Sequence, residues 1–81
     1  MFKVNVAQPA DALLHDLEGR GLIVKMERFD AKLGARHWHL GFAKRSGTLE
    51  VTDLGDECEL RVASGRDGGW ANALAEELAG A

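Results

Sequence analysis

The sequence predicts an α+β fold, a two-layer sandwich in which a four-stranded antiparallel meander carries an N-terminal and a C-terminal helix on one face (α-β-β-β-β-α). Three observations support this prediction. Apolar residues recur at helical spacing near both ends of the chain, polar and apolar residues alternate in four segments between them, and glycine-containing turns separate those segments. One apolar sheet face and two apolar helix stripes can cover each other in two layers.

The first helix is expected to begin at Pro9. Proline is tolerated in the first turn, because its missing N–H would have no partner there. Leu13, Leu14 and Leu17 then form an apolar stripe at helical spacing. The helix is expected to end within residues 19–21, where a glycine can adopt the left-handed conformation of a helix cap.

Four strands are expected between the helices, each with one apolar and one polar face. The predicted apolar faces are Leu22, Val24 and Met26; Trp38, Leu40 and Phe42; Leu49 and Val51; and Cys58, Leu60 and Val62. Turns at residues 30–34, 44–47 and 54–56 join consecutive strands, which favours a meander. Residues 1–6 alternate in the same way and allow a further short strand, whose place in the sheet the sequence does not give.

The last helix is expected to follow a glycine-rich segment, with Asp67 as its N-cap. Trp70, Leu74 and Leu78 recur at four-residue spacing and give this helix an apolar face. At 81 residues the chain is expected to form a single domain over residues 1–81. Its predicted core is Leu13, Leu17, Val24, Met26, Trp38, Leu40, Phe42, Leu49, Val51, Leu60, Val62, Trp70, Leu74 and Leu78.

The composition gives expectations about cellular location, membrane association and nucleic-acid binding. Cys58 is the one cysteine, so no intrachain disulfide can form, and a reducing, cytoplasmic location is the simplest expectation. No apolar run approaches the ~20 residues that a membrane helix requires, so a soluble protein with no membrane partner is expected. The net charge is −3, and the last helix carries Glu76 and Glu77 without a cation, which disfavours nucleic acid as a partner.

The best candidate for a chemical site is the segment Arg36-His37-Trp38-His39. Two histidines two residues apart on a strand point to the same face, with Cβ atoms roughly 7 Å apart. Glu50, on the next strand, is expected to point to the same polar face of the sheet. Two imidazoles and one carboxylate form a ligand set for metals such as zinc or iron. The alternative is that these residues simply belong to the polar face of the sheet.

Cys58 invites the hypothesis of a cysteine–histidine nucleophile pair. The alternation of side chains along a strand argues against such a pair. Cys58 falls on the apolar face of the sheet, whereas His37 and His39 both point to the polar face. Cys58 is therefore expected to be a small core residue. No nucleophile–base or acid–base pair falls on one face together with supporting residues, so neither catalysis nor a cofactor is expected.

The sequence favours a non-enzymatic protein-interaction module, whose partner is another protein or a second copy of the chain in a homodimer. A sheet covered on one side leaves a broad face and two edges open, and Ile23 and Phe29 are expected on or near that open face. Binding of a metal or a small ligand through His37, His39 and Glu50 is the alternative.

Overall fold

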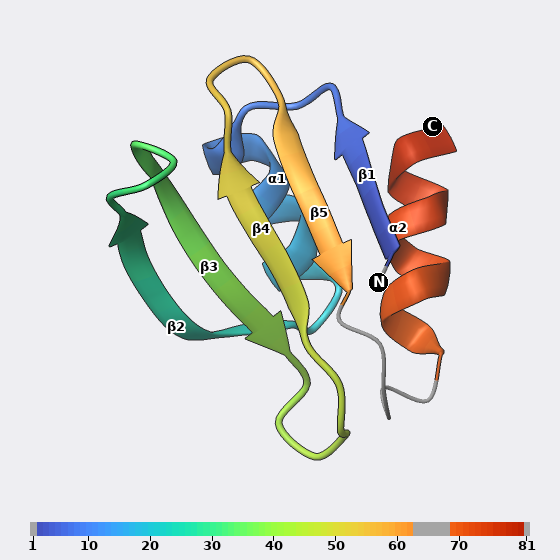
Figure 1. The fold of residues 1–81 in the computed structure, drawn as a ribbon. Helices are drawn as coiled ribbons and strands as arrows, with labels where there is room; N and C mark the ends of the chain where they lie inside the picture. Colours follow the sequence, from blue (N-terminus) through green and yellow to red (C-terminus); the bar gives the residue numbers. More distant parts are fainter. Residues whose placement is uncertain (1, 63–68, 81) are drawn as a thin grey trace.

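Five antiparallel strands form one sheet, and two helices pack against one of its faces (Figure 1). The computed structural model describes residues 2–62 and 69–80. The elements are β1 (Phe2–Val6), α1 (Ala10–Gly19), β2 (Ile23–Asp30), β3 (Ala35–Gly41), β4 (Leu49–Asp53), β5 (Cys58–Val62) and α2 (Trp70–Gly80). The predicted α+β sandwich is confirmed. Asp67, the expected cap of the last helix, lies outside the described residues.

The further strand at the start of the chain is present, and it joins the sheet at one edge. The strand order is β1-β5-β4-β3-β2, so β2 to β5 form the predicted meander and β1 pairs antiparallel with β5. In Figure 1, α1 passes behind the sheet, and α2 lies beside β1. The sheet face opposite to the helices, here called the open face, carries polar side chains from all five strands.

The strand register and the alternation of side chains along each strand determine which residues lie on the open face. Directly opposed residues on this face form two rows that cross the sheet from β2 to β1. One row contains His37, and the other contains His39. The first row is Arg28, His37, Thr52, Glu59 and Asn5. The second row is Met26, His39, Glu50, Arg61 and Lys3.

The core lies between the sheet and the helices as one cluster. The predicted core residues that are buried are Leu13, Leu17, Trp38, Leu40, Leu49, Val51, Leu60, Val62 and Leu78. Phe42, Trp70 and Leu74 are half-buried and pack against this cluster. The cluster also contains Val6, Ala10, Leu22, Cys58, Ala71 and Ala75, so β1 and the small residues of α2 contribute to it.

The predicted apolar face of the first strand of the meander was wrong at Met26, whereas Leu22, also predicted on that face, is buried in the core. The register of β2 shifts between Val24, which pairs with Leu40, and Met26, which pairs with His39. Because Leu40 and His39 point to opposite faces, Val24 and Met26 do too, and Met26 joins the open face. A β-bulge with one extra residue, Lys25, produces this change. Val24 remains 39% exposed, and Met26 is only half-buried.

The turns predicted over residues 30–34 and 54–56 are present. In the first, the Gly34 N–H donates to the Asp30 carbonyl (2.8 Å), and in the second the Gly55 N–H donates to a carboxylate oxygen of Asp53 (2.8 Å). Such local bonds satisfy backbone groups that no neighbouring strand can reach.

The connection between β3 and β4 is longer than the tight turn predicted over residues 44–47. It spans residues 42–48 and is tied to α2, because the Trp70 indole N–H donates to the Ser46 carbonyl at 2.8 Å. Phe42 stacks edge-to-face on Trp70, with 4.8 Å between ring centroids. These aromatic contacts, which favour an edge-to-face arrangement, anchor the loop to the helix.

The end of α1 is fixed by a Schellman motif. The Gly21 N–H donates to the Glu18 carbonyl (3.0 Å), and the Leu22 N–H donates to the Leu17 carbonyl (3.1 Å). Gly21 has φ 99°, in the left-handed region, as predicted for a glycine in this segment. Leu17 and Leu22 are both buried, so the motif also places the chain entering β2 against the core.

Replacing Gly21 with alanine is expected to lower the free energy of unfolding by about 1–2 kcal/mol, because a Cβ is disfavoured in the left-handed region. Gly19 is the matched control, since it lies in α1 and a Cβ there would meet no atom within 4 Å. Gly19→Ala is expected to leave the free energy of unfolding unchanged or to raise it by up to about 1 kcal/mol. Urea denaturation measures both; equal effects of the two substitutions would contradict the assignment of the cap.

Candidate metal site

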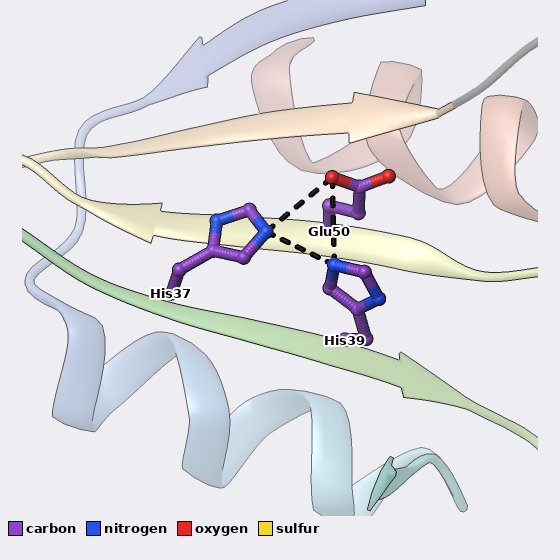
Figure 2. A group of neighbouring side chains, drawn as sticks. All are labelled: His37, His39 and Glu50. Atoms are coloured by element: carbon purple, nitrogen blue, oxygen red, sulfur yellow. Dashed lines mark hydrogen bonds and ion pairs between the residues drawn. The ribbon is translucent and has the colours of Figure 1, made fainter. Parts of the chain in front are cut away.

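The register between β3 and β4 brings the three predicted ligands together. His39 lies opposite Glu50, and His37 lies opposite Thr52. Trp38 alternates with the two histidines and is buried on the helix side, so both imidazoles extend onto the open face. Figure 2 shows the imidazoles of β3 and the carboxylate of β4 converging on one point.

The ligand atoms form a small triangle (Figure 2). The Nε2 atoms of His37 and His39 are 3.0 Å apart, and Oε1 of Glu50 lies 3.3 Å from the first and 3.6 Å from the second. A triangle with these sides has a circumradius of about 1.9 Å, slightly less than the ~2.0–2.1 Å of a zinc–nitrogen bond. A zinc ion placed just out of the plane of the triangle is therefore at bonding distance from all three atoms.

The site is more deeply buried than its place on an uncovered face suggests. The side chains of His37, Glu50 and His39 are 8%, 19% and 30% exposed. Thr52, beside His37, is also buried. Polar groups that are removed from water must find partners, so this cluster needs internal hydrogen bonds or a bound ion.

Thr52 supplies such a partner and was not predicted from the sequence. Its Oγ1 lies 2.8 Å from Nδ1 of His37. The tautomer in which Nδ1–H donates to this hydroxyl leaves the lone pair of Nε2 directed at the centre of the triangle, as a metal ligand requires. The available sequence signal was its spacing, since Thr52 follows Glu50 by two residues and shares its face.

Electrostatics favour the neutral form of His39. Burial is the largest influence and lowers its pKa; the charge of Glu50 opposes this effect, whereas His37 and Arg28 lower the pKa further. Metals bind the neutral imidazole, so a lowered pKa keeps His39 ready to act as a ligand at neutral pH.

When both histidines carry their proton on Nδ1, the two Nε2 atoms and Oε1 of Glu50 are all acceptors, and they repel one another unless a cation lies between them. One shared N–H can join the two Nε2 atoms, but it leaves the nearby carboxylate oxygen poorly satisfied. A divalent ion satisfies all three atoms at once. Within residues 2–62 and 69–80, His37, His39 and Glu50 are the group of histidine, cysteine or acidic side chains close enough to hold a metal ion.

Cys58 is the core residue that strand parity predicted. It is fully buried in the helix-side cluster, whereas the histidines lie on the open face. Burial raises the pKa of its thiol to about 11, and the nearby charges of Asp53 and Glu57 add to this effect. The thiolate that acts as a nucleophile or a metal ligand is therefore strongly disfavoured.

The Cys58 thiol of the folded protein is expected to resist Ellman's reagent at pH 8. With a pKa of about 11, only about one thiol in a thousand is ionised at that pH, and burial also blocks access. In urea the same thiol is expected to react completely within minutes. Comparable rates for folded and unfolded protein would contradict the placement of Cys58 in the core.

Comparison with known proteins adds no assignment: no protein-family model, curated protein or solved structure matches the chain. No helix in the described part of the chain is long and apolar enough to cross a membrane.

Proposed function

We propose that this protein binds a divalent transition-metal ion, with zinc as the best match, through His37, His39 and Glu50. The observation that supports the proposal most strongly is the convergence of two Nε2 atoms and one carboxylate oxygen at separations of 3.0–3.6 Å. The hydrogen-bond partner of His37, Thr52, adds a supporting contact of the kind that orients metal-bound histidines.

The chemistry of the donor atoms favours a metal of the zinc group. Two imidazole nitrogens suit zinc, copper, nickel or iron, whereas calcium and magnesium prefer sites built from oxygen ligands. Three protein ligands leave one position of a tetrahedral zinc ion open, which is typical of sites that bind a further ligand and not of closed structural sites. The reduced, buried Cys58 is consistent with a cytoplasmic location, which belongs to this proposal.

Isothermal titration of chelator-treated protein with zinc is expected to give one site per chain. His37→Ala and His39→Ala are each expected to weaken zinc affinity by at least about 100-fold, because each removes one of three ligands. His15→Ala is the matched control, since His15 is exposed on α1, and it is expected to bind zinc as the unaltered chain does.

Thermal unfolding provides an independent measurement of the same site. Zinc at about 100 times its Kd is expected to add about 2.7 kcal/mol to the free energy of unfolding, or about 10 °C or more in Tm, in the unaltered and His15→Ala chains. The two ligand variants are expected to show almost no shift while remaining folded by circular dichroism. Equal zinc affinity in all four proteins would refute the proposal.

Self-association is the second candidate function, supported by a groove with exposed apolar side chains at one end of the sheet. Phe29, Leu33 and Leu54 are 65%, 60% and 46% exposed and line this groove together with Arg36 and Asp53. A two-fold contact there would cover the apolar side chains and bring opposite charges together.

Phe29 is exposed as expected, but its position differs from the prediction. It pairs with Arg36, which lies two residues before Trp38 on the same face of β3, so beyond the bulge Phe29 falls on the helix-side face and not on the open face. Pairing through the edge of β2 is disfavoured, because a bulge and charged residues at 25, 27 and 28 are features that prevent strand addition.

Light scattering after size-exclusion chromatography tests this candidate. If the groove forms a dimer, the mass is expected to rise towards twice that of the monomer as the concentration increases, and Phe29→Ser is expected to restore the monomer. A monomer mass at every concentration would remove self-association.

A further inference from the structure

Two arginines flank the three proposed ligands on the open face. Arg28 of β2 lies opposite His37, and Arg61 of β5 lies opposite Glu50. Side chains of directly opposed residues share a face, with Cβ atoms about 4.5–5.5 Å apart. A guanidinium therefore extends from the strand on each side of the β3–β4 pair that carries the ligands.

Arg61 is incompletely satisfied. Its Nε atom is buried and has no hydrogen-bond partner among the described residues. Its Nη2 lies 3.9 Å from Oε1 of Glu59, which exceeds hydrogen-bonding distance, and Lys3 lies equally far from the same carboxylate. The Arg61 side chain is nevertheless 40% exposed, so a ligand above the sheet can approach its guanidinium group.

Arg28 is the second cation beside the proposed ligands. It forms no ion pair with any residue in the described part of the chain. Arg28 is exposed, so its long side chain is free to adapt to a ligand above the sheet.

The charges of the loaded site favour an anion. A divalent ion bound to Glu50 carries one net positive charge, and Arg28 and Arg61 raise the total to three. Glu59 and Lys3, the next charged pair on the face, cancel each other. Arginine binds the oxygens of carboxylates and phosphates with two parallel hydrogen bonds, and the open position of the metal accepts one of the same oxygens.

We propose that a metal ion at His37, His39 and Glu50 keeps one coordination position for an oxyanion, the carboxylate or phosphate group of a small molecule, which Arg61 and Arg28 orient. This inference rests on the proposed metal binding. It specifies the ligand class of the site: the anion binds the metal through one oxygen and accepts hydrogen bonds from the arginines through the others.

Cobalt(II) is the suitable probe, since its visible absorption reports coordination directly. Cobalt-loaded protein is titrated with inorganic phosphate and, separately, with acetate, at constant ionic strength set by perchlorate. At least one of the two anions is expected to change the cobalt spectrum. Arg61→Gln and Arg28→Gln are each expected to weaken the affinity of that anion by about tenfold or more, while cobalt remains bound.

Arg45→Gln is the matched control. Arg45 stacks over Phe42 and Trp70, away from the open face, so its removal changes the net charge equally without touching the site. A response to phosphate alone, to acetate alone or to both supports the inference and identifies the class of oxyanion.

The outcomes separate the two proposals. Protein that never develops a cobalt spectrum would overturn the proposed metal binding. A normal cobalt spectrum that neither anion changes would overturn only this inference. Anion affinities that are the same in Arg61→Gln, Arg28→Gln and Arg45→Gln would likewise overturn it, because the arginines would then have no part in binding.

Discussion

The register between β3 and β4 is the constraint on which the rest of the structure depends. On one face it places Trp38 against Val51 in the core, and on the other it places His39 opposite Glu50. A shift by one residue would exchange the two faces of β3, moving the histidines into the core and the tryptophan into water. Core packing therefore stabilises the register that assembles the candidate site, and the site needs no separate scaffold.

Alternation alone made much of this arrangement predictable. It identified the meander, the faces of β3 and β4 and the exclusion of Cys58 from the histidine face, because each depends on a period of two within one strand. It did not predict the bulge at Lys25 or the position of β1 beside β5. Both depend on which residues of two strands pair with each other, and the sequence of a single strand does not give that information. The role of Thr52 was missed for a related reason. The sequence shows that Thr52 and His37 lie on the same face, but only the register between β3 and β4 shows that they are directly opposed.

The burial of His37 on an uncovered sheet face is the feature that distinguishes the site from an ordinary polar surface. A solvated histidine needs no partner, but His37 is enclosed and contacts Thr52 through one ring nitrogen and His39 through the other. Glu50 brings a negative charge to the same point. The two imidazoles and the carboxylate are the groups of the proposed cation site, and the nearby arginines are those of the proposed anion site.

The most direct test of the metal site is a long-range proton–nitrogen NMR spectrum of the histidine side chains, recorded during a zinc titration. We predict that zinc shifts the Nε2 signals of His37 and His39 to values typical of coordinated nitrogen. With zinc bound, both rings should carry the proton on Nδ1, and that of His37 should donate to the Thr52 hydroxyl 2.8 Å away. His15 is expected to be unchanged. Uniform small shifts of all three histidines, or retention of a proton on Nε2 of both His37 and His39 at saturating zinc, would contradict the account.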